Sequence, residues 1–190
     1  DEFYRQSERG EIYQKYLEQL IAADKAYLSK EEVKEEGQRA EVIRFRNPGG
    51  KIIFNDLIRG EITFDVSELG DFIIAKSLSE PLYHLAVVVD DIDMKVTHII
   101  RGDDHISNTP RQILLTEAFG ASRAIYAHLP LMLASDKSKL SKRKHGEAVS
   151  IKFYREQGYL PEALINFLAL VGWNPGTEQE MFSLDELVKT

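Results

Sequence analysis

The stretch Lys139-Leu140-Ser141-Lys142-Arg143 lies in a strongly basic part of the chain. Residues 137–144 contain five basic residues, two serines and no acid, in a protein of formal net charge -7. Lysine ammonium groups are compact point charges, so two lysines three residues apart in a loop suit a polyphosphate. A solvated basic turn is an equally good interpretation of the pentapeptide alone, because short basic runs are common. The surrounding sequence has to decide between the two.

The composition predicts an ordinary globular protein. The 190 residues are 43% apolar, which suffices for a hydrophobic core in one large domain or two small ones. The balance of 24 basic and 31 acidic residues argues against general coating of nucleic acid, so any RNA contact has to be a local patch. The chain has no cysteine for disulfides or thiolate metal sites, and its longest apolar run, 85–89, is too short to span a bilayer. We expect a cytoplasmic protein with no membrane role.

The N-terminal part has a helical pattern. Apolar residues at three- and four-residue spacing predict a helix from about residue 7 to residue 27. Ser29-Lys30-Glu31-Glu32 has the pattern of a capping box, which predicts a second short helix. We expect Tyr4, Arg5 and Arg9 to be capping or surface residues rather than RNA contacts.

The pattern changes to alternation after residue 40. Residues 41–66 alternate between apolar and polar side chains around short turns, which predicts antiparallel strands. Arg44, Arg46 and Arg59 lie in this segment and are candidates for phosphate contacts, although an exposed strand position without function is the better interpretation of Arg46. Residues 71–76 predict a buried strand that returns to the main sheet.

Residues 96–101 predict a strand that ends in Arg101. In open parallel sheets, ligands bind beyond the carboxyl ends of the strands, and a guanidinium can hold a carboxylate with two parallel hydrogen bonds. Arg101 is therefore a candidate for orienting an acidic substrate, and a structural pair with Asp103 or Asp104 is the competing interpretation. The carboxylates at 90, 91 and 93 are expected to form a solvated turn rather than a magnesium site.

The sequence Thr109-Pro110-Arg111-Gln112 predicts the start of a helix capped by Thr109, and Gly120 its end. A strand over residues 126–132 leads to the basic loop, and we expect His128 within it to be structural. Tyr83 would be a core residue and His84 a structural histidine on the residues alone.

Start and stop signals predict helices after the basic loop as well. The first is expected over residues 151–157, with Ser150 as its cap, and the second begins at Pro161. A capping box at Ser183 predicts a last helix.

Six segments of the sequence are informative when they are taken together, namely residues 4–9, 55–60, 97–105, 108–112, 139–143 and 158–164. In this order they resemble the class I aminoacyl-tRNA synthetases, and within that class the glutamyl branch. The pentapeptide 139–143 is similar to the KMSKS signature of the class. The resemblance covers nearly the whole chain, and the joint occurrence of these segments is far more specific than any one of them.

The resemblance implies an α/β fold class. The chain would form the second half of a Rossmann-like class I synthetase catalytic fold, with an α+β acceptor-binding insertion and a small helical stem-contact unit. The implied boundaries are 1–78 for the insertion, 79–137 for the second half of the nucleotide-binding fold, and 138–190 for the KMSKS-like loop with a truncated stem-contact region.

The resemblance also assigns roles to residues. Lys142, helped by Lys139, would stabilise the charge that builds on the phosphates of ATP, which Mg²⁺ would accompany. The implied ATP-binding residues are Lys139, Leu140, Ser141, Lys142, Arg143 and Asp104; the glutamate-binding residues are Tyr83, Arg101 and His105; and the contacts to tRNA(Glu) are Arg44 and Arg59. No residue of this chain is expected to bind zinc or another metal.

The HIGH motif, which is the family's other signature, is absent from these residues. None of the histidines at 84, 98, 105, 128 and 145 is followed by another histidine three residues later. We therefore interpret the chain as an internal fragment of a glutamyl-tRNA synthetase without the HIGH half and the anticodon-binding domain, and we expect it to be inactive or nearly so alone. Glutaminyl and glutamyl-queuosine enzymes are alternatives within the family, and a non-catalytic tRNA-binding module is the alternative from another class.

Overall fold

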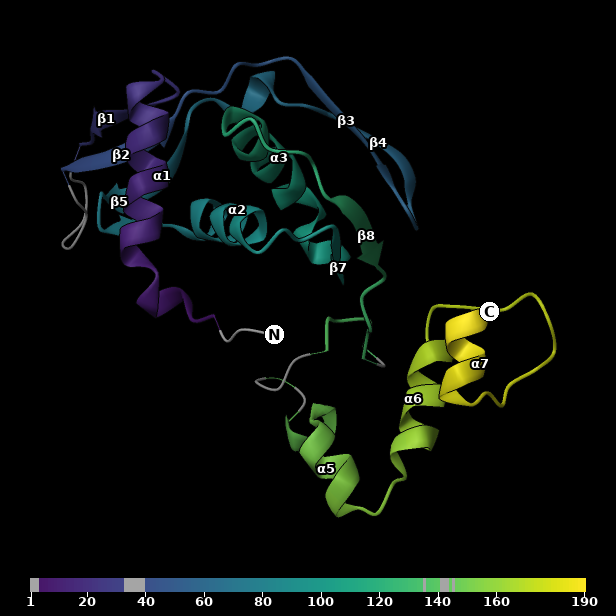
Figure 1. Ribbon diagram of the computed structural model, residues 1–190. Helices are drawn as coiled ribbons and strands as arrows, with labels where there is room; N and C mark the ends of the chain where they lie inside the picture. The colour runs from purple at the N-terminus through teal and green to yellow at the C-terminus, as the bar shows by residue number, and fades with distance from the viewer. Residues whose placement is uncertain (1–3, 33–39, 135, 141–143, 145) are drawn as a thin grey trace. The chain divides into compact units, whose positions relative to one another are not determined.

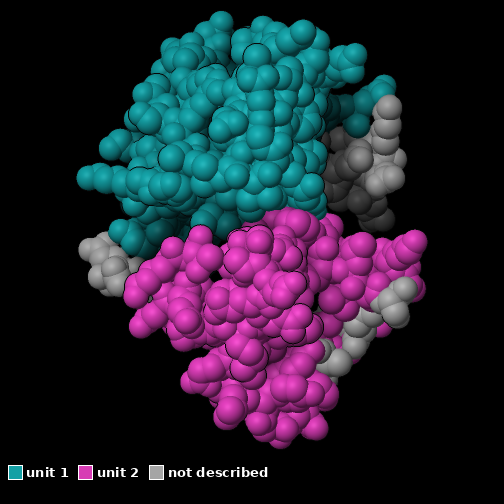
Figure 2. All heavy atoms as spheres, turned by 90° about the vertical axis from the view of Figure 1, so that its right-hand side faces the viewer, with its two compact units in different colours: residues 1–128 teal, residues 129–190 magenta. Residues whose placement is uncertain are grey.

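The computed structural model describes residues 4–32, 40–134, 136–140, 144 and 146–190. The chain divides into two compact units, unit 1 (Asp1–His128) and unit 2 (Leu129–Thr190), which Figure 2 distinguishes by colour. Among the described residues, no helix is long and apolar enough to cross a membrane.

The first sheet of unit 1 is antiparallel. Its strands, in spatial order, are β1 (Ala26–Lys30), β2 (Glu41–Phe45), β5 (Phe72–Ser77) and β6 (Glu80–Pro81). The short η1 (Gln6–Glu8) and the helix α1 (Gly10–Ala22) precede it, and α1 lies beside β1 and β2 in Figure 1. The apolar face of α1 buries Tyr13, Leu17 and Leu20 at the helical spacing seen in the sequence.

The second sheet of unit 1 combines a hairpin with strands that follow later in the chain. Its order is β4 (Gly60–Asp65), β3 (Lys51–Asp56), β8 (Ile125–Leu129) and β7 (His98–Gly102). The pair β3 and β4 is antiparallel, whereas β3 and β8 are parallel, with Asp56 opposite Tyr126. This parallel pairing brings the carboxyl end of β3 beside residues about 70 positions further along the chain.

Two helices complete the core of unit 1. They are α2 (Tyr83–Asp93) and α3 (Thr109–Ala118), which contact each other, and η3 (Asp103–Asn108) leads directly into α3 (Figure 1). Leu85 and Val89 on α2, and Ile113 and Leu115 on α3, have no exposed surface. Burying each such side chain stabilises the fold by about 1.5–3 kcal/mol relative to leaving it exposed.

Some of the predicted elements are wrong in type or in place. The first helix ends at Ala22 rather than near residue 27, and Asp24 has a positive φ of 54° that turns the chain into β1. Ser29 caps no helix, because it lies in β1 opposite Val42 of β2, and this strand pairing outweighs the local capping pattern. The segment 33–39, where the predicted second helix would continue, lies outside the described residues.

The predicted strands of the alternating segment exist but belong to two sheets. β2 lies in the first sheet, whereas β3 and β4 lie in the second, so of these three strands β2 does not pair with β3, and β3 and β4 form a hairpin. The strand β5, expected to join the main sheet, instead pairs with β2, with Phe72 opposite Phe45. The alternation predicted strands correctly but contained no information about the partner of each strand.

A buried ion pair fixes α1 to α2. Arg9 donates to Asp90 at 2.8 Å and to Asp93 at 2.6 Å, and Asp90 also accepts from the Tyr13 hydroxyl at 2.8 Å and from Gln6 at 2.8 Å. Arg9 and Asp90 are only 7% and 8% exposed, so the predicted surface role of Arg9 and the predicted solvated turn at Asp90 are wrong. The hydrogen bond to Asp93 is the main cause that raises the pKa of Arg9, and burial raises the pKa of Tyr13 to about 12.

Unit 2 consists of short helical elements. They are η4 (Gly146–Val149), α5 (Ile151–Glu156), α6 (Pro161–Leu170) and α7 (Leu184–Lys189), of which α6 and α7 contact each other. The predicted caps are confirmed: Ser150 accepts from Phe153 N, and Ser183 forms a capping box with Glu186. Among the described residues of unit 2, no apolar side chain is fully buried.

Candidate functional site

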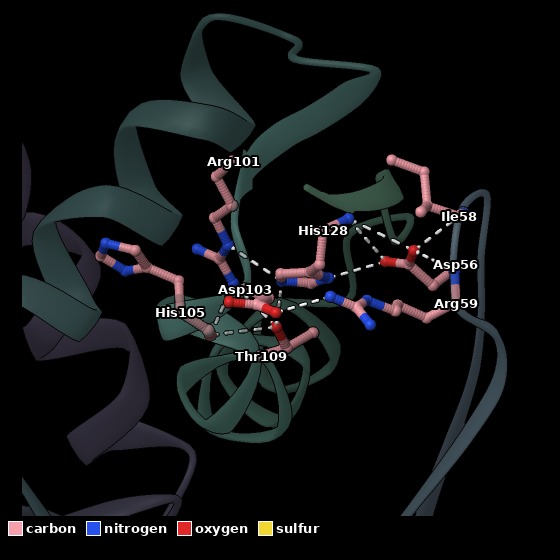
Figure 3. A network of polar contacts seen from close by, with 8 residues as sticks. All are labelled: Asp56, Ile58, Arg59, Arg101, Asp103, His105, Thr109 and His128. Carbon is pink, nitrogen blue, oxygen red and sulfur yellow. Dashed lines mark hydrogen bonds and ion pairs between the residues drawn. The ribbon is translucent and has the colours of Figure 1, made fainter. Parts of the chain in front are cut away.

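Polar side chains converge at the edge of the second sheet where its strands end (Figure 3). Asp56 is the last residue of β3, Arg101 lies at the end of β7, His128 lies in β8, and Thr109 is the first residue of α3. Because β3 and β8 run parallel, the ladder places Asp56 opposite Tyr126, and the Asp56 side chain reaches His128 two residues further along β8. Ends of parallel strands are where ligands bind in open α/β sheets.

Asp56 is a buried carboxylate with many donors. It is 1% exposed and accepts hydrogen bonds from the backbone N–H groups of Ile58 and Arg59, both at 3.0 Å, and from the backbone and the ring of His128. Burial by itself raises the pKa of the Asp56 carboxyl, but these hydrogen bonds outweigh burial and hold the pKa below its usual value. The carboxylate is therefore ionised at neutral pH.

His128 connects Asp56 to Arg101. Its Nδ1 lies 2.7 Å from Asp56 Oδ2, and its Nε2 accepts from Arg101 Nε at 3.2 Å. The ring has no exposed surface and stacks on Tyr126 with ring centroids 6.0 Å apart. The expectation that His128 is structural agrees with its burial, but the sequence did not show that it holds Arg101.

Among the contacts of the described residues, Arg101 has no ion pair with Asp103 or Asp104. Its Nη2 donates to Thr109 Oγ1 at 2.8 Å, while Asp103 pairs with Arg59 at 2.6 Å. The competing interpretation of Arg101 as a structural partner of Asp103 or Asp104 therefore finds no support among the described residues. Thr109 does not cap α3 either, since Asn108 holds the N-cap position and the Thr109 hydroxyl is engaged by Arg101 and His128.

The three residues assigned to glutamate lie in one region of unit 1. The ring centroids of Tyr83 and His105 are 6.2 Å apart, and the His105 carbonyl accepts a hydrogen bond from Arg101 Nη2 at 3.4 Å. Tyr83 is 47% exposed, so the core position expected from the residues alone is wrong. Asp104 Oδ2 lies 3.8 Å from His105 Nε2. The pKa of the neighbouring His84 is lowered, mainly by burial and also by the positive charges of Arg111 and Arg101.

The two arginines assigned to tRNA are both paired in the structure. Arg44 donates to Glu31 at 2.7 Å and Arg59 to Asp103 at 2.6 Å, and these pairs are partly exposed. Arg46, for which an exposed position was the better interpretation, pairs with Asp24 at 3.2 Å, and its guanidinium carbon lies 4.4 Å from the centroid of the Tyr27 ring.

The basic loop belongs to unit 2 and starts as a tight turn. Leu133 and Lys139 form an antiparallel bridge around this turn, in which Lys137 has a positive φ of 61°. Asp136 accepts from the backbone and the hydroxyl of Ser138 and from Lys144 Nζ at 3.0 Å. Lys139 is exposed and Leu140 half-buried. Ser141, Lys142 and Arg143 lie outside the described residues.

A cleft of about 440 Å³ lies elsewhere in unit 1, between α2, α3 and the strands β7 and β8. Burial raises the pKa of Asp91 in this cleft to about 6, and the buried Gln112 Nε2 has no hydrogen-bond partner among the residues that the structure describes. Neither residue was singled out as functional from the sequence. Buried polar groups in helices carry no distinctive pattern, so only the three-dimensional packing reveals them.

Comparison with known proteins places the chain in a family. Residues 28–190 match the profile described as tRNA synthetases class I (E and Q), catalytic domain. The chain is 44% identical to a glutamate–tRNA ligase of Aquifex aeolicus over 100% of the chain and 47% of the relative. It is 47% identical to glutamate–tRNA ligase 2 of Coxiella burnetii over 98% and 45%.

Solved structures agree with this result. The crystal structure of a glutamate tRNA ligase from Elizabethkingia meningosepticum in complex with its amino acid is similar with a TM-score of 0.83 and 32% identity, covering 100% of this chain and 49% of that chain. The chain thus spans about half the length of the relatives it matches. With a family match over most of its residues and the same fold, the chain belongs to the class I tRNA synthetases of the glutamyl and glutaminyl (E and Q) family, within their catalytic domain.

Proposed function

We propose that this chain is part of a cytoplasmic glutamate–tRNA ligase, which activates glutamate with ATP and transfers it to tRNA(Glu). The observation that carries the proposal is the environment of Arg101, a cation at the end of β7 that is held by His128 and Thr109 and has no carboxylate partner among the described residues. A guanidinium held in this way suits the carboxylate of an amino-acid substrate. The names of the relatives support the same reaction.

The proposed chemistry needs no protein nucleophile. A carboxylate oxygen of glutamate attacks the α-phosphorus of ATP, pyrophosphate leaves, and a ribose hydroxyl of tRNA then displaces AMP from the glutamyl-adenylate. Alignment of the reactants and positive charge near the phosphates would supply the rate. We assign the phosphates to Lys142 and Lys139, with Leu140, Ser141, Arg143 and Asp104 as further ATP contacts.

Magnesium would accompany the nucleotide in this proposal. Among the described residues no group of three His, Asp or Glu side chains could hold a metal ion. The described part of the chain therefore offers no protein cage for Mg²⁺, which commonly binds to proteins through substrate phosphates and water.

Contact of Arg44 and Arg59 with tRNA stays a prediction. Each guanidinium is paired with a carboxylate, Glu31 or Asp103, so an RNA phosphate would have to replace or share that partner. Partly exposed ion pairs contribute at most about 1 kcal/mol, so such an exchange is energetically accessible.

The test is glutamate-dependent exchange of pyrophosphate into ATP. We expect no exchange by the 190 residues alone, and exchange by a protein of the relatives' full length that carries these residues. There, Lys142→Ala should abolish it, and Arg101→Lys should raise the KM for glutamate, because an ammonium cannot make two parallel hydrogen bonds to a carboxylate. Lys152→Ala is a matched control, since Lys152 is an exposed lysine paired with Glu156 on α5.

Two outcomes would contradict parts of this proposal. Brisk exchange by the 190 residues alone would show that they contain a complete active site. Exchange that depends on glutamine rather than glutamate would assign the protein to the glutaminyl side of the family.

A further inference from the structure

Arg101 is held differently from most arginines of unit 1. Its three hydrogen bonds go to uncharged acceptors, namely His128 Nε2, Thr109 Oγ1 and the His105 carbonyl. Other arginines of the unit are paired with carboxylates: Arg9 with Asp90, Arg44 with Glu31, Arg46 with Asp24, Arg59 with Asp103 and Arg123 with Glu117. Within the described part of the chain, no direct partner therefore neutralises the charge of Arg101.

The hydrogen bond between Arg101 and His128 determines where the imidazole carries its proton. An arginine Nε–H can only donate, so His128 Nε2 has to accept with its lone pair. A neutral ring that accepts at Nε2 carries its hydrogen on Nδ1, and Nδ1 lies 2.7 Å from Asp56 Oδ2. The direction of donation thus runs from Arg101 to His128 and from His128 to Asp56 (Figure 3).

Asp56 in turn is fixed by the backbone. Its Oδ1 accepts from the N–H groups of Ile58 and Arg59 in the turn that leaves β3, and both of its oxygens lie within 3.2 Å of His128 N. The carboxylate therefore cannot rotate away without leaving several donors unpaired inside the protein. This rigidity is passed on to the His128 ring, whose Nδ1 has no other polar contact within the described part of the chain.

We propose that Asp56 and His128 are positioning residues for Arg101: the aspartate fixes the imidazole as the Nδ1–H tautomer, and the imidazole holds the guanidinium without neutralising it. A carboxylate in place of His128 would hold Arg101 as firmly, but it would also compete with an acidic substrate for the same charge. The inference rests on the proposed function for its substrate, glutamate, while its geometry can be tested independently.

The geometry can be tested on the 190-residue chain by ¹⁵N NMR of the histidine rings at neutral pH. The signals that disappear in His128→Asn identify the His128 ring. We expect this ring to be neutral, with its hydrogen on Nδ1 and an unprotonated Nε2. Asp56→Asn should abolish this fixed tautomer, and His98→Gln, which changes an exposed ring outside the network, should leave it intact. A His128 ring protonated on Nε2 in the unmodified protein would overturn the proposal.

Two substitutions of His128 separate positioning from mere stability. Asparagine places a donor where Nδ1 was and keeps the bond to Asp56, whereas glutamine places an acceptor where Nε2 was and keeps the bond to Arg101. In a full-length protein that carries these residues, His128→Asn should raise the KM for glutamate about tenfold to a hundredfold, with the KM for ATP unchanged. His128→Gln should raise it less, although it is the less stable variant because Asp56 loses a donor.

If His128→Asn is the more stable variant and yet has the higher KM for glutamate, the result supports positioning. If the more stable variant also has the lower KM, His128 has a structural role only. If glutamate activation is normal in both variants, the positioning inference fails while the proposed function stands. If no variant and no wild-type protein activates glutamate but the Nδ1–H tautomer is observed, the proposed function fails and the Asp56–His128–Arg101 arrangement stands without its substrate.

Discussion

In unit 1 the helices bury their apolar faces, with Leu17, Leu85 and Ile113 at 0% exposure, whereas in unit 2 Phe167 on α6 and Val188 on α7 are 62% and 79% exposed. The polar interactions differ in the same way. Unit 1 contains a buried ion pair, Arg9 with Asp90, and the described helices of unit 2 depend on caps and exposed pairs. The comparison teaches that long-range packing determines the stability of unit 1 and that mainly local interactions support the helices of unit 2.

The largest expected effect comes from breaking the buried ion pair of unit 1. Asp90→Ala leaves the Arg9 guanidinium buried and without this partner, which should lower the free energy of unfolding of unit 1 by about 3–5 kcal/mol. The matched change in unit 2 is Glu156→Ala, which breaks the exposed pair with Lys152 and should cost less than about 0.5 kcal/mol.

Hydrogen exchange of the amides in α2 and α3 measures unit 1, and the fluorescence of Trp173, the single tryptophan of the chain, measures unit 2. A loss of less than 1 kcal/mol for Asp90→Ala would contradict the difference between the two units, because such a pair would then behave as a surface pair.

The next effect concerns apolar packing. Leu17→Ala removes a side chain with no exposed surface and should destabilise unit 1 by about 2–5 kcal/mol, whereas Phe167→Ala should change the stability of unit 2 by no more than about 0.5–1 kcal/mol. Denaturant titration, followed by hydrogen exchange for unit 1 and by Trp173 fluorescence for unit 2, compares them. If Phe167→Ala were as destabilising as Leu17→Ala, the exposed face of α6 would have to be covered in solution.

The third prediction is that the stability of unit 1 depends on pH through Asp91. Burial raises the pKa of Asp91 to about 6 in the folded protein, above the ordinary value of 3.8. The folded state therefore binds a proton more tightly than the unfolded chain, and stability present below pH 4 is lost as the pH rises through about 6. Asp91→Asn should stabilise unit 1 by about 1–2 kcal/mol at pH 8 and should have no effect on its stability near pH 3.5. The value at pH 8 is about half of what the full pKa shift implies, because the cleft is open to solvent.

The difference in unfolding free energy between wild type and Asp91→Asn across this pH range checks the prediction. Asp24→Asn serves as a control, since the Asp24 side chain is 85% exposed. A stabilisation that is the same at pH 3.5 and pH 8 would show that charge on Asp91 is not its cause.

The smallest effect should be local to unit 2. Ser183→Ala removes the hydroxyl that accepts from Glu186 N and donates to Glu186 Oε2, while the backbone N–H of residue 183 still donates to that carboxylate. The change should weaken α7 by about 1 kcal/mol. Faster hydrogen exchange confined to residues 184–189 would agree, and Ser138→Ala, a serine outside the helices of unit 2, serves as the control. Equal changes in unit 1 amides would contradict the view that unit 2 is locally stabilised.

Several local elements of this protein could be predicted from residues that are close together in the sequence. The caps of α5 and α7, the Pro161 start of α6 and the β3–β4 hairpin follow from residues within a few positions of each other, and the structure confirms them. The family resemblance was also carried by short segments, and the comparisons confirm it. The ATP and glutamate assignments, from Lys142 to Arg101, stay predictions, because they concern ligands rather than the chain itself.

Only the tertiary structure decided which distant groups meet. Ser29 has a good capping pattern but lies in β1, because pairing with β2 satisfies its backbone over a whole strand. Arg9 and Asp90 are charged residues that the sequence predicts to be exposed, and they become buried because each satisfies the other across 81 positions. His128 holds Arg101, and Asp56 holds His128, because a parallel pairing brings β3 beside β8. Local propensity is encoded within a turn or a strand, whereas charge pairing and burial depend on contacts that no short window of sequence contains.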